Sequence, residues 1–171
     1  MKFLIEIEEL SVELRSMLAV EATNILLLRV LAKDTTPEVR KNVAINFYTE
    51  SSVLAELAKD IDDTVRKYVA ANINTPKTVL HFLAIDEDQK VRENVAENLN
   101  TSKRDLIILS HDGSMRVRKN VALNPNSPTK ALMNLIHDKF EGVRKAIASN
   151  ANTSKEILKI LGDDGYLNVL L

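Results

Sequence analysis

Apolar residues form two kinds of short stripe that alternate along the chain. In the first stripe an aliphatic residue recurs after four positions and is followed by alanine, as in Val65, Val69 and Ala70. In the second stripe two leucines stand three positions apart, as in Leu80 and Leu83. Because spacings of three and four place side chains on one face of a helix, the pattern predicts two short amphipathic helices in alternation.

The whole pattern recurs every 26 residues without an insertion. Each unit begins with an aspartate, and a Val-Arg pair follows it. Isolated helices shorter than about 12 to 15 residues are marginal in water, so neighbouring units must stabilise one another by stacking. We therefore expect an all-α solenoid of two-helix repeats. The aspartates and arginines form two ladders: Asp34, Asp60, Asp86, Asp112, Asp138 and Arg40, Arg66, Arg92, Arg118, Arg144.

Polar residues mark the predicted helix ends. We expect an asparagine to end each first helix in the left-handed conformation, and a hydroxyl residue to cap each second helix. Pro76 and Pro128 are expected at the first position of their helices. The asparagines are Asn46, Asn72, Asn98, Asn124 and Asn150, and the hydroxyl residues are Thr49, Thr75, Thr101, Ser127 and Thr153.

The repeats predict a single domain over residues 1–171. Residues 1–33 are expected to form a degenerate N-terminal cap repeat, 34–163 five full repeats, and 164–171 a partial C-terminal cap. The last unit ends on an apolar segment. That ending allows three interpretations: it packs back as a cap, it forms a homodimer through the C-terminal end, or it belongs to a longer array.

The N-terminal cap keeps part of the register. Glu13 stands at the valine position and Leu14 at the arginine position, which indicates a degraded first helix. Met17 and Leu28 match the apolar positions of later repeats. The second helix of this cap is therefore expected to be better preserved than the first.

Composition excludes several classes of chemistry. The chain has no cysteine, which excludes disulfides, thiolate zinc sites, cysteine-bound iron-sulfur clusters and a cysteine nucleophile. With four glycines it has no phosphate loop or nucleotide fingerprint, and neither a nucleophile elbow nor an HExxH motif occurs. His111 and His137 lie one repeat apart, too far to share a metal ion. We therefore expect no catalytic residues, no cofactor and no metal.

Charge and hydropathy limit the expected partners and cellular location of the protein. The formal net charge of −1 gives no overall attraction to nucleic acid or anionic lipid. No apolar run approaches the length of a membrane span, and the N-terminal residues do not resemble a secretory signal. We expect a soluble, cytoplasmic protein.

The repeat motif resembles a known family. Val-Arg-x-x-Val-Ala-x-Asn-x-x-Thr-Pro-x-x-x-Leu, intact from Val65 to Leu80, resembles the leucine-rich repeat variant, and the Asp-x4-Val-Arg element resembles HEAT-type solenoids. The resemblance covers about residues 28–164. It implies a right-handed superhelix of helix pairs, in which one member is often a three-ten helix. The 26-residue unit is longer than is usual for the family, which favours two α-helices per unit.

The Asp and Arg ladders admit two interpretations. Repeated guanidinium groups could bind a phosphate backbone or an acidic peptide. Alternatively, each aspartate caps a helix and each arginine pairs with that aspartate or with its neighbour's. We favour the structural role, because positions repeated in every unit usually serve the stacking that every unit shares.

Recognition is expected at positions that vary between repeats. These lie on the exposed face of the Val-Arg helix, which by analogy with HEAT repeats lines the concave surface. A basic stripe there is interrupted by Glu93 and Glu97. The candidate partner-binding residues are Lys41, Asn42, Lys67, Tyr68, Asn94, Arg116, Lys119, Asn120 and Lys145.

The leading functional prediction is a non-enzymatic scaffold that binds a segment of a partner protein on its concave helical face. One alternative is a HEAT-like module that binds nucleic acid through the Arg and Lys rows. A second is a regulatory repeat segment of a larger protein. No membrane association is expected.

Overall fold

The computed structural model describes residues 7–163, and in this part of the chain every regular element is a helix. The prediction of an all-α fold is confirmed. The predicted C-terminal cap, residues 164–171, lies outside the described residues. The first helices of the pairs are α2 (Val12–Glu21), α4 (Pro37–Ile45), α6 (Asp63–Ala71), α8 (Gln89–Glu97), α10 (Met115–Leu123) and α12 (Glu141–Ser149). The second helices are α3 (Ile25–Leu31), α5 (Ser51–Leu57), α7 (Lys77–Leu83), α9 (Lys103–Leu109), α11 (Thr129–Leu135) and α13 (Lys155–Asp163).

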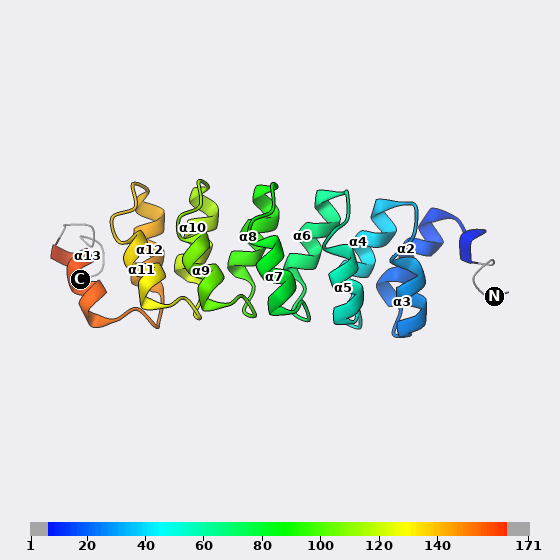
Figure 1. Ribbon diagram of the computed structural model, residues 1–171, viewed down its shortest axis with the longest axis horizontal. Helices are drawn as coiled ribbons and strands as arrows, with labels where there is room; N and C mark the ends of the chain where they lie inside the picture. The colour runs from blue at the N-terminus through cyan, green and yellow to red at the C-terminus, as the bar shows by residue number, and fades with distance from the viewer. Residues whose placement is uncertain (1–6, 164–171) are drawn as a thin grey trace.

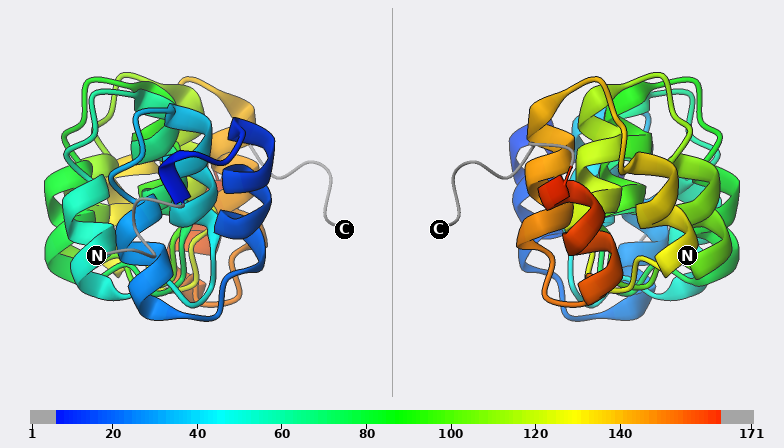
Figure 2. Two further views of the ribbon diagram at one scale, coloured as in Figure 1. Left: turned by 90° about the vertical axis from the view of Figure 1, so that its right-hand side faces the viewer. Right: turned by 90° about the vertical axis from the view of Figure 1, so that its left-hand side faces the viewer.

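The helix pairs stack side by side along one long axis (Figure 1). From α4 to α12 each first helix has nine residues and begins 26 positions after the one before it. Seen along the axis, successive pairs are displaced around it instead of lying directly behind one another (Figure 2). None of the helices between residues 7 and 163 has the length and apolar character needed to cross a membrane.

The two rows of helices are packed unequally. First helices of neighbouring pairs make many close contacts, whereas second helices of neighbouring pairs make few. A stack that is tighter on one side curves toward that side, so the first helices lie on its inner surface. We call this inner surface the first-helix face.

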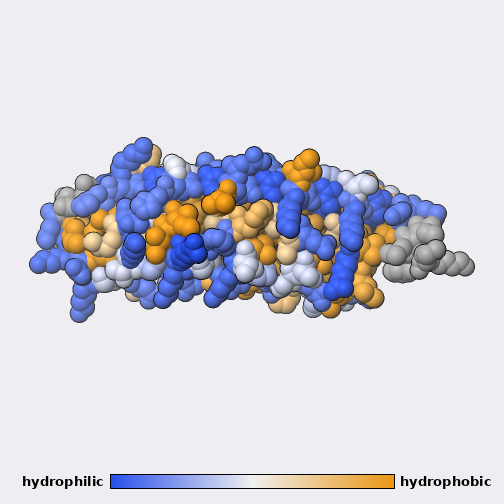
Figure 3. All heavy atoms as spheres, viewed as in Figure 1, coloured by the Kyte–Doolittle hydropathy of each residue, from blue (hydrophilic) through white to orange (hydrophobic). Residues whose placement is uncertain are grey.

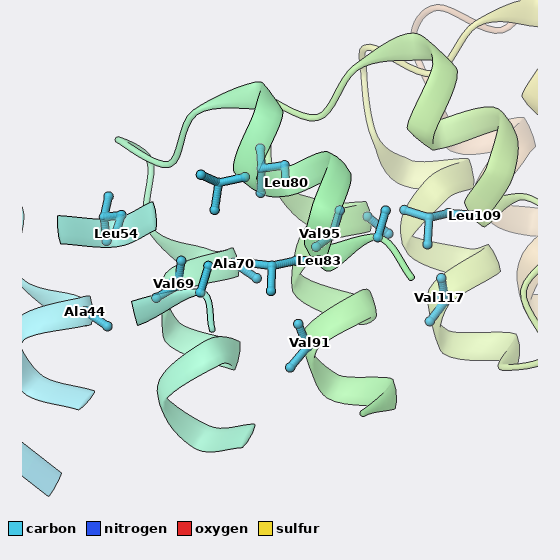
Figure 4. Packing of buried hydrophobic residues seen from close by; sticks show 14 of the residues in the cluster. Ala44, Leu54, Val69, Ala70, Leu80, Leu83, Val91, Val95, Leu109 and Val117 are labelled. Carbon is cyan, nitrogen blue, oxygen red and sulfur yellow. The ribbon is translucent and has the colours of Figure 1, made fainter. Parts of the chain in front are cut away.

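The core is one continuous cluster that passes through all the pairs. In α8, Val91, Val95 and Ala96 are fully buried, and Leu80 and Leu83 of α7 pack in the same layer (Figure 4). The alanine is decisive for the spacing, because a larger side chain at this fully buried position would hold neighbouring first helices apart. Outside the core, hydrophobic residues lie in gaps between hydrophilic side chains along the whole stack (Figure 3).

The predicted conformation of the helix-ending asparagines is wrong. Asn72 and Asn98 are the C-cap residues of α6 and α8, but their φ and ψ angles, −69° and 128° for Asn72 and −65° and 128° for Asn98, are extended. No left-handed turn is needed, because their side chains are held by the preceding repeat, as described below. The helix therefore ends on a contact between repeats and not on a local cap.

The predicted caps of the second helices are also wrong. The N-cap of α7 is Pro76 and not Thr75, so the proline precedes the first helical position. The hydroxyl group of Thr75 instead donates to the carbonyl oxygen of Val69, 2.5 Å away, inside the core. Thr49 and Thr153 make the equivalent bond to Val43 and Ile147. The hydroxyl residue fastens the turn to the end of the first helix.

The N-terminal cap differs from its predicted register. Arg15, and not the residue at the predicted position, Leu14, pairs with Asp34, at 2.6 Å between Nε and Oδ2. Met17 is 56% exposed, while Ala19 is fully buried. The reason is that α2 begins 25 residues before α4 instead of 26, because three residues join α2 to α3 whereas five join α4 to α5. Leu28 is buried as predicted.

Candidate partner-binding surface

The Asp-Arg ladder is an internal clamp between repeats. The guanidinium group of Arg66 donates to both carboxylate oxygens of Asp86 in the next repeat, at 2.8 and 3.0 Å. Its third nitrogen donates to the carbonyl oxygen of Asp60, 2.9 Å away. The same arrangement recurs in the pairs Arg15-Asp34, Arg40-Asp60, Arg92-Asp112 and Arg118-Asp138, and Arg144 donates to the carbonyl oxygen of Asp138.

Each ladder aspartate also shapes the turn that leads into the next helix. One oxygen of Asp86 accepts the backbone N–H of Asp88 at 2.9 Å, and Asp88 is itself the N-cap residue of α8. The ladder aspartates thus lie two positions before the cap, which corrects the prediction that they cap the helix themselves. Their carboxylates bind the turn and the neighbouring arginine together. This arrangement leaves the ladder little capacity for an external phosphate.

The ladder lowers the pKa of Asp34, Asp60, Asp86 and Asp138. Burial raises the pKa of Asp60 and Asp86, but hydrogen bonds from an arginine and from a backbone N–H, with the arginine's positive charge, outweigh burial. The pKa values of Asp34 and Asp138 are lowered by the same balance. The carboxylates are therefore more stable in the ionised form in the folded chain than in the unfolded chain.

We expect acid to destabilise the folded protein by protonating the ladder aspartates. A lowered folded-state pKa contributes stability that is complete above the unfolded value, about 3.9, and that disappears as the pH falls through the folded pKa. The free energy of unfolding from urea titrations should fall progressively as the pH drops below about 5. An Asp86→Asn variant should be less stable at neutral pH and show a shallower decline. An unchanged free energy of unfolding over this range would contradict the prediction.

A second ladder consists of the helix-ending asparagines. The amide of Asn98 donates to the carbonyl oxygens of Ala70 and Asn72 in the preceding repeat, at 2.8 and 3.0 Å. Its side-chain oxygen accepts the N–H of Asn100 at 2.8 Å. Asn46, Asn72, Asn124 and Asn150 bond to the preceding repeat in the same way. Their recurrence in every repeat was the sequence signal for this role.

Three of the predicted partner-binding residues also take part in stacking. Asn42, Asn94 and Asn120 lie on the first-helix face, and their amides donate to backbone carbonyl oxygens of the preceding repeat, at 3.4, 3.1 and 3.1 Å. Asn42 is buried. These amides hold neighbouring first helices together, a use that helical spacing alone did not indicate.

The basic candidates remain at the surface of the first-helix face. Lys67 lies 4.6 Å and Lys41 5.9 Å from the centre of the Tyr68 ring, so the two ammonium groups flank one aromatic side chain. Arg116 and Lys119 are exposed. Lys41 pairs with Glu38 and Lys145 with Glu141, each within its own helix. Within the described part of the chain, Lys67, Arg116 and Lys119 make no ion pair.

The comparisons with known proteins agree with this geometry. A solved structure described as a leucine-rich repeat variant with a novel repetitive structural motif superposes with a TM-score of 0.66 and is 27% identical in sequence. The match covers 96% of this chain and 70% of that one. The chain has the leucine-rich repeat variant fold. Neither a family model nor a curated protein matches the sequence.

In this leucine-rich repeat variant fold His81 lies on a second helix, and His111 and His137 lie in the turns that follow second helices. Nδ1 of His81 on α7 lies 2.6 Å from Oδ1 of Asp105 on α9, and the hydroxyl group of Ser102 donates to the other carboxylate oxygen. The carboxylate lies between the two, so the histidine cannot activate the serine as a base. Nε2 of His111 contacts Asn134. No group of three potential metal ligands occurs among the described residues.

Hollows interrupt the described surface of the leucine-rich repeat variant fold where an apolar ligand group could enter. One, about 1060 Å³, opens at the N-terminal end beside Ile7, Leu27 and Val30. A second, about 300 Å³, lies between α6 and α8 at the edge of the first-helix face, and a third, about 320 Å³, lies beside Ile85 and Ile108. The sequence pattern predicted none of them, because each depends on how neighbouring repeats meet.

Proposed function

We propose that the protein is a non-enzymatic scaffold that binds a segment of a partner protein on the first-helix face. The observation that carries the proposal is that two groups of polar side chains have different roles. The residues repeated in every unit, the Asp, Arg and Asn ladders, bind neighbouring repeats. Residues that are not repeated in every unit, among them Lys67, Tyr68, Arg116 and Lys119, stay at the surface of one continuous face.

A protein partner suits this face better than a nucleic acid. The guanidinium groups of Arg66 and Arg118 are buried and bound to aspartates, so they offer few donors to a phosphate. The lysine row is interrupted by Glu93 and Glu97, whose charges would repel a phosphate backbone. A polypeptide can place its own charges to match this mixed pattern.

Charge reversal on the first-helix face tests the proposal. We expect a Lys67→Glu/Lys119→Glu variant to bind a native partner at least about tenfold more weakly. The new carboxylates would repel the acidic groups of the partner that the lysines attract in the unmodified protein. The partner is first identified by cross-linking in host extract and then purified. Its dissociation constant is measured by titration calorimetry against both forms of the protein.

The second-helix row provides a matched control. Lys77 on α7 and Lys130 on α11 are exposed, and reversing both charges changes net charge equally on the opposite side of the stack. This variant should bind the partner with nearly unchanged affinity. Equal weakening by the two variants would reduce the effect to net charge and refute the proposed face. Tight, strongly salt-dependent binding of an oligonucleotide by the unmodified protein would point to nucleic acid instead.

A further inference from the structure

A row of large apolar side chains stands exposed along the edge of the first-helix face. Phe47, Ile73 and Leu99 occupy the same position in three successive repeats, directly after the asparagine that ends the first helix. They are 66%, 60% and 57% exposed. We call these three residues the apolar ridge. Contiguous exposed apolar surface of this kind marks an interaction site in soluble proteins.

The backbone of the ridge is fixed by the repeats that follow it. The amide of Asn74 donates to the carbonyl oxygen of Phe47, and that of Asn100 to the carbonyl oxygen of Ile73, both at 2.5 Å. Asn126 bonds in the same way to Leu99 at 2.8 Å. The ridge is therefore ordered before any ligand arrives, which removes part of the entropic cost of binding.

The hollow between α6 and α8 lies within this ridge. It is lined by Ala71, Ile73, Asn94, Glu97, Asn98 and Leu99 and has a volume of about 300 Å³. Ile73 and Leu99 are successive members of the ridge, while Ala71 and Glu97 belong to the last turn of the first helices. An aliphatic side chain of a ligand can thus enter between two repeats, with its backbone passing along the first-helix face.

A row of lysines runs parallel to the apolar ridge. Lys41, Lys67, Lys119 and Lys145 occupy one position of successive first helices, and Glu93 is the exception in α8. Each lies four residues before the last residue of its helix and so shares a face with that residue, which in α6 is Ala71 of the hollow. On one flank, a ligand with apolar groups on the ridge would meet Lys41, which is paired with Glu38, then Lys67, and Glu93 in the third repeat of the ridge.

Neighbouring members of the apolar ridge lie one repeat apart, which sets the spacing required of a ligand. Packed neighbouring helices lie about 8 to 10 Å apart. A polyproline-II segment rises about 3.1 Å per residue with three residues per turn, so every third side chain falls on the same side after about 9.3 Å. A β-strand repeats its faces after two residues, about 6.6 Å, and does not match.

We propose that the first-helix face binds an extended, polyproline-II-like segment with an apolar side chain at every third position and acidic residues between them. The apolar side chains occupy the ridge and its hollow, and the acidic ones face the lysine row. Opposite Glu93 an acidic residue is disfavoured. This inference rests on the proposed function and specifies the partner's chemistry.

Synthetic peptides test the spacing. The probe is a fluorescein-labelled peptide of about twelve residues that repeats Leu-Pro-Glu, and its control has the same composition with the leucines at irregular intervals. Fluorescence anisotropy with the full chain should show at least about tenfold tighter binding of the regular peptide. A peptide that repeats Leu-Pro-Lys should bind more weakly than the Leu-Pro-Glu peptide.

Variants of the ridge locate the binding. Ile73→Ser/Leu99→Ser should weaken binding of the Leu-Pro-Glu peptide at least about tenfold, with an unchanged circular dichroism spectrum. Phe82→Ser/Met133→Ser, which replaces exposed apolar residues of the second helices, should leave the affinity within about twofold. Both pairs are solvent-exposed, so neither replacement opens a cavity in the core.

Several outcomes would overturn this inference. They are equal affinity for the regular and irregular peptides, equal effects of the ridge and second-helix variants, and no binding at about 1 mM peptide. Displacement of the peptide by a single-stranded oligonucleotide would also contradict the inference that a polypeptide occupies the first-helix face. If the native partner is still lost on charge reversal of Lys67 and Lys119 but not in the ridge variant, only this inference fails and the proposed function stands.

Discussion

Replacing Asn98 by alanine is expected to lower the free energy of unfolding by about 3 kcal/mol, because each buried polar group left without a partner costs about 1 to 3 kcal/mol. The amide of Asn98 satisfies the carbonyl oxygens of Ala70 and Asn72, and its oxygen satisfies the N–H of Asn100. All three bonds are lost together. Urea denaturation followed by circular dichroism at 222 nm, the usual wavelength for helices, measures the loss.

Aspartate at the same position separates hydrogen bonding from packing. Asn98→Asp keeps the size and the acceptor but faces two carbonyl oxygens with a carboxylate, so it should be less stable than Asn98→Ala at neutral pH. It should recover stability on mild acidification, since a protonated carboxyl can donate to one of them. Glu97→Ala, an exposed position on the same helix, should change stability by less than about 0.5 kcal/mol. If the Asn98→Ala variant were as stable as the Glu97→Ala variant, the asparagine ladder would contribute little to the free energy of unfolding.

The helices and their buried faces could be predicted because helical periodicity records burial directly. Val65 and Val69 face the core of the structure, as do Leu80 and Leu83, which the three- and four-residue spacing had placed on buried faces. An exact recurrence also allowed the pairing of Arg with Asp to be anticipated, since the two types are complementary and occur once in each unit. Both inferences use only the order of residues along the chain.

The helix ends could not be predicted in this way, because their partners lie in another repeat. Asn98 reaches backbone groups 26 and 28 residues before it, and local propensity contains no such contact. Local preference alone favoured a left-handed cap. The register error at Arg15 has a different origin: the connection between α2 and α3 is shorter than the later ones, so Arg15 lies 19 residues before Asp34, whereas Arg40 lies 20 before Asp60.

The candidate surface was predicted in part. Helical spacing placed Lys67 and Lys119 on the first-helix face but also placed Asn94 there, whose amide is used between repeats. The apolar ridge was missed because Ile73 and Leu99 stand in turns, where no helical or strand period applies. Its signal was the recurrence of a bulky apolar residue at a position that no buried stripe explains.

Replacing Arg66 by alanine is expected to cost about 3 kcal/mol, since removing one partner of a buried ion pair leaves the other charge uncompensated. Asp86 would lose both of its guanidinium bonds, and the carbonyl oxygen of Asp60 would lose its donor. Arg66→Lys should recover less than about half of the loss, because an ammonium group cannot donate in a fork to two oxygens and reach a carbonyl behind it.

A double-mutant cycle with Asp86→Ala isolates the pair from the other contacts of each residue. The double variant should be at least about 1 kcal/mol more stable than the sum of the two single losses predicts, because the second substitution removes a charge already unpaired. Unfolding free energies from urea titrations at neutral pH supply the four corners of the cycle. Strict additivity would mean that Arg66 stabilises the stack through the carbonyl oxygen of Asp60 and its aliphatic stem, with Asp86 acting only on its own turn.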